Sequence, residues 1–187
     1  MTAPRVILGI SGASGAALGL SAARQLNELC VEIDLVTSNA AERTLLQECG
    51  PDAFETLQAL VTRTHAIDNI GACIASGSVP ICGMIVAPCS MRSLAAIAIG
   101  LDDNLLTRAA SVQLKERRRL ILLAREAPLT LAHLRNMTAA TEQGAIILPP
   151  VPAFYLKPKG VKEIVDQIAA RAVDLLGIAE PAAKQWV

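Results

Sequence analysis

Short apolar runs alternate with longer segments of helical periodicity along most of this sequence. Strands are predicted at 5–10, 31–37, 83–88, 119–125 and 145–150. Helices are predicted at 15–29, 39–49, 91–99, 103–117, 130–142 and 160–176. Because the strands are apolar on both faces, they belong in a parallel sheet that helices cover on both sides. We predict a doubly wound α/β fold, with 51–82 as its least regular part.

The composition is that of one compact domain. Of the 187 residues, 52% are hydrophobic and 18% are charged, which allows a sizeable core. No linker, repeat or low-complexity stretch divides the chain, so we expect a single domain over 1–187. A mean hydropathy of +0.44 is high for a small monomer. It predicts contacts in a homo-oligomer, with 178–187 as a candidate contact tail.

The charge balance and the apolar runs exclude several classes of partner. Seventeen Lys and Arg residues balance seventeen Asp and Glu residues, so no long-range field attracts nucleic acid or an anionic membrane. No apolar run reaches the roughly 20 residues that a membrane span needs, and the first residues continue into a strand. We expect a cytoplasmic protein that binds anions through local groups.

The cysteines and histidines predict neither disulfides nor a metal site. The five cysteines are odd in number and lack C-x-x-C spacing, so we expect reduced thiols. The two histidines, His65 and His133, lie far apart in sequence and have no obvious Cys or carboxylate partners.

The loop after the first predicted strand, residues 9–16, is rich in glycine and serine. Ligands of doubly wound sheets bind outside the carboxyl ends of the strands. Small residues here let the backbone approach a ligand, and the next helix can offer free amides to a phosphate. A purely structural turn is the alternative, since the loop matches neither G-x-G-x-x-G nor a P-loop.

Two residues of the second strand region bear on the choice of ligand. Asp34 lies about 20 residues after the first loop, where an NAD-binding protein has a ribose-binding acid. Asp34 is inside the predicted strand, however, whereas Ser38 holds the strand end. Ser38 is equally well explained as a ligand contact or as the N-cap of the following helix.

Polar residues also follow the third and fourth of these strands. Residues 90–93 add hydroxyl groups and amides at a second helix start, while Cys89 is better explained as a buried thiol than as a nucleophile. Arg125 and Glu126 end an apolar strand at the expected pocket edge, which suits proton handling or stabilisation of a cation. The arginines at 117–119 close a helix and are expected to face solvent.

Seven stretches in order resemble the UbiX flavin prenyltransferase family, over nearly the whole chain. They are GISGASGA (9–16), VTSNAAERTLLQE (36–48), ASGS (75–78), APCSMRSLAAIA (87–98), NLLTRAASVQLKERRRLILLAREAPL (104–129), HLRNM (133–137) and GAIILPPVPAFYLKP (144–158). Each stretch alone is a weak signal. Their order and spacing together are highly specific.

The resemblance implies a flavodoxin-like (Rossmann-like) fold and a metal-independent enzyme that binds reduced FMN. Family members transfer a dimethylallyl group from dimethylallyl phosphate to flavin N5 and then to C6. The prenylated FMN serves UbiD-type decarboxylases in ubiquinone synthesis or aromatic-acid metabolism. The resemblance further implies a homo-oligomer, namely a dodecamer.

Roles for individual residues also follow from the resemblance. FMN contacts are expected from Gly12, Ala13, Ser14, Ser38, Ser90, Met91, Arg92, Ser93 and Arg125. The prenyl phosphate is expected to meet Arg108, Lys115, Tyr155, Arg171 and, further out, Trp186. Catalysis is assigned to Ser14, Lys115 and Glu126, with Glu48 as an outer member. Cations that hold the phosphate oxygens favour its departure, and Glu126 can steady the carbocation or accept the C6 proton.

Three departures from the family pattern concern the edge of the flavin site. Asn39 stands where members often have lysine, Met91-Arg92-Ser93 is an unusual run, and Arg119 replaces a common proline. The related flavin-dependent cysteine decarboxylases carry a P-A-S-A-N-T run that is absent here. A carrier that only delivers FMN to a decarboxylase is the non-enzymatic alternative, although it would not need the prenyl-phosphate residues.

Topology predicts an unusual place for Lys115. It lies in the last turn of a helix that precedes a strand, and such helices run back from the carboxyl edge of the sheet. Lys115 is therefore expected at the opposite edge, remote from its own pocket. If it binds the prenyl phosphate, a neighbouring subunit must supply it.

Overall fold

The computed structural model describes residues 3–186 and contains one six-stranded parallel sheet. Its strands are β1 (Arg5–Ile10), β2 (Glu32–Thr37), β3 (Arg63–His65), β4 (Gly83–Cys89), β5 (Arg119–Ala124) and β6 (Ile146–Ile147). Their spatial order is β3-β2-β1-β4-β5-β6, so the chain starts in the middle of the sheet and winds outward on both sides. The predicted doubly wound fold is confirmed.

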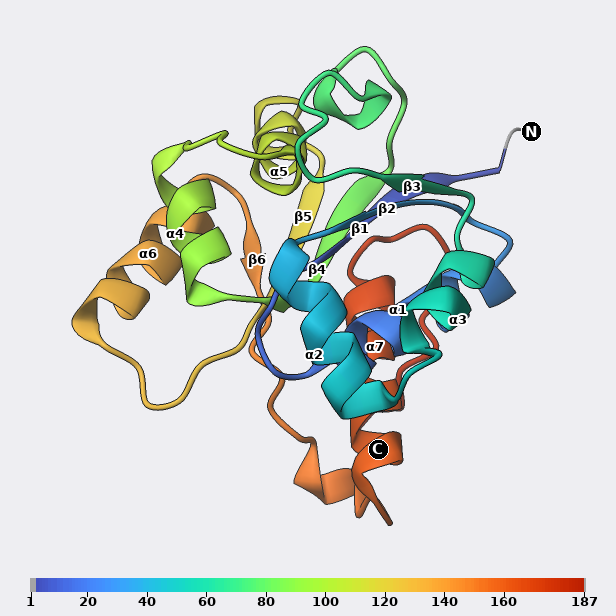
Figure 1. Ribbon diagram of the computed structural model, residues 1–187. Helices are drawn as coiled ribbons and strands as arrows, with labels where there is room; N and C mark the ends of the chain where they lie inside the picture. Colours follow the sequence, from blue (N-terminus) through green and yellow to red (C-terminus); the bar gives the residue numbers. More distant parts are fainter. Residues whose placement is uncertain (1–2, 187) are drawn as a thin grey trace.

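Helices cover both faces of this sheet (Figure 1). One layer contains α1 (Ala16–Glu28), α2 (Asn39–Cys49), α3 (Ala53–Leu60) and α7 (Val161–Asp174), and the other contains α4 (Met91–Ile99), α5 (Leu105–Lys115) and α6 (Leu131–Glu142). Strand β1 shows why the strands are continuously apolar. Leu8 packs into the first core, between the sheet and the layer that contains α1 and α7. Its neighbour Ile7 packs into the second core, between the sheet and the layer that contains α4 and α5, and both residues are fully buried.

The largest differences from the predicted boundaries lie in two places. Residues 51–82 contain α3, the short strand β3 and the 3-10 turn η1 (Cys73–Ala75). Strand β3 escapes periodicity analysis because it has only three residues, Arg-Thr-His, at the edge of the sheet. Strand β6 ends at Ile147, three residues before the predicted end, and the prolines at 149 and 150 cannot donate to a strand ladder.

The expectation that the arginines after α5 face solvent was wrong for Arg118, whereas Arg117 and Arg119 are exposed. Arg118 is half-buried and donates to the carbonyl oxygens of Val79 (2.9 Å) and Gly77 (2.7 Å). Arg119 donates to the carbonyl oxygen of Leu175 at 2.9 Å. These side chains tie β5 to the loop before β4 and to the end of α7.

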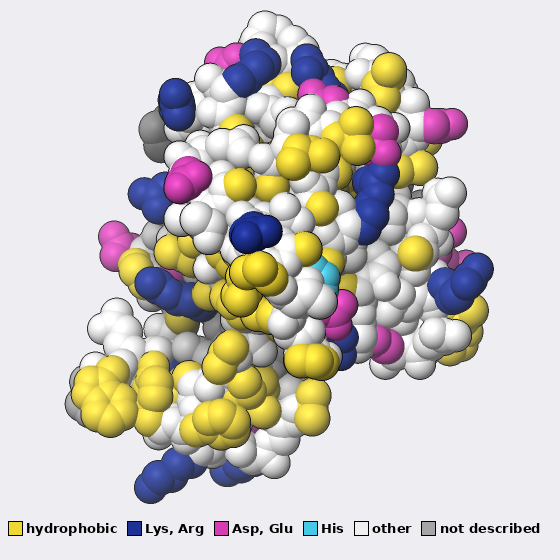
Figure 2. All heavy atoms as spheres, turned by 90° about the vertical axis from the view of Figure 1, so that its left-hand side faces the viewer, with side chains coloured by type: hydrophobic (Ala, Val, Ile, Leu, Met, Phe, Trp, Pro, Cys, Tyr) yellow, Lys and Arg dark blue, Asp and Glu magenta, His cyan; other side chains and the backbone are white. Residues whose placement is uncertain are grey.

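A lobe at the bottom of Figure 1 contains the 3-10 turn η2 (Phe154–Leu156), the start of α7 and the tail after it. Hydrophobic side chains gather on this lobe in Figure 2. Phe154 is 74% exposed and Trp186 is 75% exposed, which is unusual for large apolar side chains. An oligomer contact of the tail stays a prediction. Among residues 3–186, no helix is both long and apolar enough to cross a membrane.

Candidate flavin and prenyl-phosphate sites

The loops at the carboxyl edge of the sheet are tied together by Ser11. Its hydroxyl donates to the carbonyl oxygen of Pro88 at 2.8 Å and accepts from the backbone amide of Ser90 at 2.7 Å. The backbone amide of Arg125 donates to the carbonyl oxygen of Cys89 at 3.0 Å. The ends of β1, β4 and β5 are thereby fixed side by side, as the strand-end rule predicts.

A cleft of about 510 Å³ opens at this edge, between the N-termini of α2 and α4. Its lining residues are Gly12, Ser38, Asn39, Ala40, Ile67, Asp68, Ser90, Arg92, Ser93, Asp103, Asn104 and Leu106. Five predicted FMN contacts therefore line one cavity. Backbone amides at two helix N-termini make it suitable for a phosphate. We call it the edge cleft.

Ser38 does not act as a side-chain cap of α2 within residues 3–186, and its contact with a ligand stays a prediction. It occupies the N-cap position of α2, yet within residues 3–186 its side chain makes no capping bond. Its hydroxyl oxygen is buried and has no partner among those residues. A buried hydroxyl without a hydrogen bond is unfavourable, so an acceptor such as a phosphate oxygen fits here.

Ser90 differs from Ser38, because it is a true cap. Its hydroxyl accepts from the backbone amide of Ser93 at 3.3 Å and lies 3.2 Å from the Ser93 hydroxyl. Met91 packs against the second core, and Arg92 pairs with Asp103 at the cleft. Asp103 is a cleft residue that the sequence analysis did not single out, and only its place at the predicted start of a helix hinted at it.

Gly12 allows α2 to approach the first loop. A Cβ atom added at Gly12 would lie 2.3 Å from the Cβ of Ala40, far inside van der Waals contact. The residue after Ser14 is also necessarily a glycine, since Gly15 has a φ of 107°. The glycines of this loop therefore serve close packing and a left-handed turn next to the cleft.

The side chain of Glu48, a residue of α2, lies at the N-terminus of α1, where free amides were expected. Its carboxylate accepts from the backbone amides of Gly15 (2.8 Å) and Ala16 (2.9 Å) and from the Ser14 side chain. Burial raises the pKa of this carboxyl, but these three hydrogen bonds and the charge of Arg125 outweigh it, so the pKa lies below its usual value. The expectation that these amides are free for a phosphate was wrong.

Glu48 connects two other predicted site residues, because Ser14 donates to it and Arg125 lies close enough to lower its pKa. Arg125 and Glu126 are exposed after β5, at the predicted edge. The Glu126 carboxylate accepts from the backbone amide of Ala127 at 3.0 Å. Exposed charged groups at this edge are accessible to a ligand.

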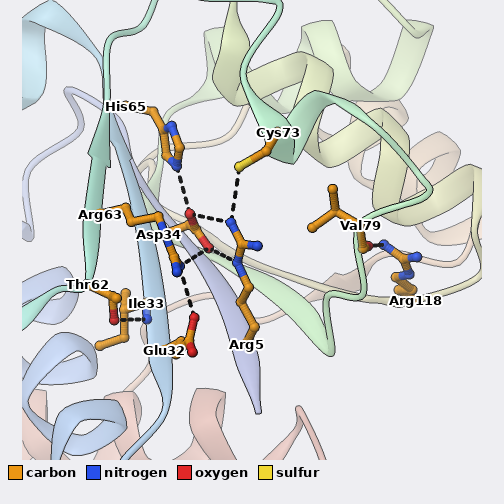
Figure 3. A network of polar contacts seen from close by, with 10 residues as sticks. All are labelled: Arg5, Glu32, Ile33, Asp34, Thr62, Arg63, His65, Cys73, Val79 and Arg118. Carbon is orange, nitrogen blue, oxygen red and sulfur yellow. Dashed lines mark hydrogen bonds and ion pairs between the residues drawn. The ribbon is translucent and has the colours of Figure 1, made fainter. Parts of the chain in front are cut away.

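Cys89 and Asp34 do not serve as nucleophile or ribose ligand. Cys89 is fully buried, and burial raises the pKa of its thiol to about 12, which confirms the structural interpretation. Asp34 is fully buried inside β2 and accepts from Arg5 Nε at 2.5 Å and Arg5 Nη2 at 2.9 Å (Figure 3). The NAD alternative loses its ribose-binding acid.

The same network corrects the expectation that His65 lacks polar partners. His65 Nε2 lies 2.7 Å from Asp34 Oδ1, and Cys73 Sγ accepts from Arg5 Nη2 at 3.1 Å. Ligand atoms of Asp34, His65 and Cys73 lie within 4.8 Å of one another, because β3 pairs with β2. The Arg5 guanidinium contacts both the carboxylate and the thiol, and its charge opposes a cation between them.

A second pocket, of about 490 Å³, lies between η2, α7 and the tail. Three of the five residues expected to meet the prenyl phosphate line it, namely Tyr155, Arg171 and Trp186. The rings of Tyr155 and Trp186 meet edge to face, with centroids 4.9 Å apart and an interplanar angle of 78°. Within residues 3–186, this C-terminal pocket shares no lining residue with the edge cleft.

The other two predicted prenyl-phosphate residues lie on α5. Arg108 pairs with Asp102 at 3.0 Å and is partly exposed. Lys115 ends α5, pairs with Glu116 and lies beside Gly77, four residues before β5 begins. It is therefore at the amino edge of the sheet, away from the edge cleft of its own chain, as topology predicts.

Comparison with known proteins identifies the family. A model of the Flavoprotein family matches residues 1–173. The flavin prenyltransferase UbiX of Neisseria meningitidis is 52% identical over 182 residues, which cover 97% of this chain and 96% of that protein. The chain belongs to the UbiX family of flavin prenyltransferases. The yeast mitochondrial flavin prenyltransferase PAD1 is 44% identical over 97% of this chain and 75% of its own.

Solved structures agree with this membership. The crystal structure of AnUbiX (PadA1) in complex with FMN and dimethylallyl pyrophosphate has a TM-score of 0.94 at 42% identity, covering 100% of this chain and 98% of that one. A dodecameric UbiX-like protein from Escherichia coli O157:H7 has a TM-score of 0.93 at 42% identity, covering 98% and 99%. The cysteine decarboxylase TvaF, at 17% identity, shares the fold alone.

Proposed function

We propose that this flavin prenyltransferase joins the dimethylallyl group of dimethylallyl phosphate to N5 and C6 of reduced FMN. The product would be prenylated FMN for a UbiD-type decarboxylase. The observation that carries the proposal is the Ser38 hydroxyl, which has no partner within residues 3–186 and lies in a cleft between two helix N-termini, where the flavin phosphate fits. The FMN and dimethylallyl pyrophosphate named for the related structure support this ligand pair.

The prenyl donor is bound, in this proposal, by Arg171 and Tyr155 of the C-terminal pocket. Lys115 of the partner subunit completes the set of positive charges. Charge that develops on the departing phosphate is then compensated by groups already in place, which lowers the barrier to breaking the allylic C–O bond. The reduced flavin supplies the nucleophilic nitrogen and carbon.

Groups at the carboxyl edge of the sheet, near the edge cleft, position the reaction and handle its proton. Glu48 fixes the first loop through Ser14, whose hydroxyl we place near flavin N5. Glu126 is exposed at the same edge, and its carboxylate steadies the allylic cation or accepts the proton that leaves C6. Arg125 contacts the flavin and offsets the negative charge of Glu48.

The carrier alternative explains the edge cleft but not the C-terminal pocket. FMN storage requires phosphate and ring contacts, whereas Tyr155, Arg171 and Trp186 gather in a separate pocket. A second anion-binding pocket favours a two-substrate enzyme. We also propose a cytoplasmic homo-oligomer, since all five cysteines are free thiols and large apolar side chains are exposed on the C-terminal lobe.

Mass analysis of the flavin tests this function directly. The protein is incubated anaerobically with reduced FMN and either dimethylallyl phosphate or dimethylallyl pyrophosphate. The mass of the extracted flavin is then determined by mass spectrometry. We expect a flavin heavier by one C5 unit with the monophosphate. Unmodified FMN with both donors, from protein that binds FMN, would support the carrier instead.

A further inference from the structure

One face of α7 carries Gln167, Arg171 and Asp174. Their spacing of four and three residues places them one above another on the helix surface. All three line the C-terminal pocket. Arg171 is the proposed phosphate ligand, which leaves the roles of the two residues on either side of it to be explained.

Gln167 and Asp174 both hold the main chain of the tail, residues 178–186. Gln167 Nε2 donates to the carbonyl oxygen of Lys184 at 3.1 Å, and the backbone amide of Lys184 donates to Gln167 Oε1 at 3.0 Å. The Asp174 carboxylate accepts from the backbone amides of Ala182 (2.8 Å) and Ala183 (3.1 Å). The tail therefore runs antiparallel to α7, with Arg171 between its two anchors.

The two anchors are specific for this arrangement. Asp174 is the last residue of α7, where the helix dipole disfavours a negative charge, and the two amides of the tail compensate it. Gln167 satisfies both main-chain groups of a single residue, as a neighbouring strand would. Together they fix the backbone two residues before Trp186.

Trp186 depends on these anchors for its position. Its side chain is 75% exposed in the single chain, so burial within that chain contributes little to holding it, and its ring contact is with Tyr155. Figure 1 shows the end of the chain beside η2, which carries Tyr155. If the tail left α7, Trp186 would leave Tyr155, and the pocket around Arg171 would lose one wall.

We propose that Gln167 and Asp174 are positioning residues for prenyl transfer. They hold the tail against α7, so that Trp186 and Tyr155 stay aligned beside Arg171 where the prenyl phosphate binds. Neither residue contacts the reacting atoms. This inference rests on the proposed function, because it assigns the C-terminal pocket to the prenyl donor.

The first test uses Trp186, the single tryptophan of the chain, as a reporter of the tail. Fluorescence anisotropy and acrylamide quenching are measured for wild type, Gln167→Ala and Asp174→Ala. We expect a more mobile and more quenchable tryptophan in both variants. Gln167→Glu, which cannot donate to Lys184, should be intermediate, as should Asp174→Asn, which keeps an acceptor oxygen. Gln58→Ala, an exposed substitution on α3, is the matched control and should resemble wild type.

The second test measures prenyl transfer with the same proteins. The KM for dimethylallyl phosphate should rise roughly tenfold in Gln167→Ala and Asp174→Ala, since each loses two hydrogen bonds that position the pocket. The Kd for FMN and the thermal unfolding midpoint should stay as in Gln58→Ala. An immobile Trp186, or a mobile Trp186 with an unchanged KM, overturns this inference alone. A wild-type protein that forms no heavier flavin overturns the proposed function and this inference together.

Discussion

Ser38 has a buried hydroxyl group that the protein itself leaves without a partner among residues 3–186. Removing the hydroxyl should therefore leave the stability of the flavin-free protein intact while it weakens the binding of FMN. In Ser38→Ala without flavin, the free energy of unfolding should stay level or rise by up to about 1 kcal/mol, because an unsatisfied polar group disappears. The affinity for FMN should fall by roughly tenfold, because a hydrogen bond to a charged phosphate is lost.

Urea unfolding of the flavin-free protein and titration with FMN measure the two effects. Ser90→Ala is the informative comparison, since Ser90 also caps α4. Its loss should lower the free energy of unfolding by about 1 kcal/mol as well as the FMN affinity. A Ser38→Ala protein that is less stable but binds FMN normally would make Ser38 a structural residue.

Asp34 contributes a pH-dependent part of the stability. Burial raises the pKa of its carboxyl, but hydrogen bonds from Arg5 and His65 outweigh it, so the pKa is lowered in the folded state. A lowered pKa means that the carboxylate stabilises the fold above the unfolded value of about 3.9. That contribution is lost as the pH falls through the lower folded-state value.

Asp34→Asn should lower the free energy of unfolding at neutral pH by about 3 kcal/mol, because Arg5 loses its buried partner. Between about pH 5 and about pH 2, the variant should lose less stability than wild type does. Urea unfolding followed by circular dichroism over this range measures both effects. Glu32→Gln, which breaks an exposed pair with Arg63, should change stability by only about 0.5 kcal/mol. Equal pH dependence in wild type and Asp34→Asn would contradict this account.

At the level of elements, the approach of α2 to the first loop depends on Gly12. A Cβ in Gly12→Ala would meet the Cβ of Ala40 at 2.3 Å and its backbone at 3.2 Å, so the loop or the helix must shift. We expect the free energy of unfolding to fall by about 1–3 kcal/mol and the affinity for FMN to fall with it. Denaturant unfolding and FMN titration measure these changes. Gly71→Ala, whose Cβ would meet its nearest atom at 3.7 Å, should behave like wild type, and equal behaviour of the two variants would argue against this packing.

The apolar strands were predictable from the sequence because both their faces are buried, as Ile7 and Leu8 show. Strand β3 was not, since a polar edge strand of three residues carries no periodic signal. Strand ends located Ser38 and Ser90 at the edge cleft for the same geometric reason that applies to all doubly wound sheets.

Contacts between residues distant in sequence set the limit of that prediction. Glu48 lies in the last turn of α2 but accepts hydrogen bonds at the start of α1, and only the packing of the two helices brings these ends together. The partners of His65 likewise arise from pairing of β2 with β3. The anchors Gln167 and Asp174 bind main-chain groups of the tail, which any residue type offers, so the tail sequence gave no sign of them.

At the scale of the whole molecule, the residues proposed for the reaction lie at separate places. The edge cleft, the C-terminal pocket and Lys115 at the amino edge do not meet within residues 3–186 of one chain. A reaction that joins a flavin to a prenyl group needs both ligands in contact. The proposed assembly of several copies would bring these places together, and it would also cover exposed apolar side chains such as Phe154.

This arrangement predicts complementation between two inactive variants. Lys115→Ala should turn over slowly for lack of a phosphate ligand, and Glu126→Gln for lack of the carboxylate. If each site takes Lys115 from one subunit and Glu126 from another, an equal mixture that exchanges subunits should regenerate wild-type residues in about a quarter of the sites. The prenylation rate of the mixture, compared with each parent and with wild type, measures this.

A mixture of Lys115→Ala with the double variant Lys115→Ala/Glu126→Gln is the control and should stay inactive. If the first mixture exchanges subunits, shown by mass spectrometry of the intact assemblies, and is no more active than its parents, both residues act within one chain and the shared site is excluded.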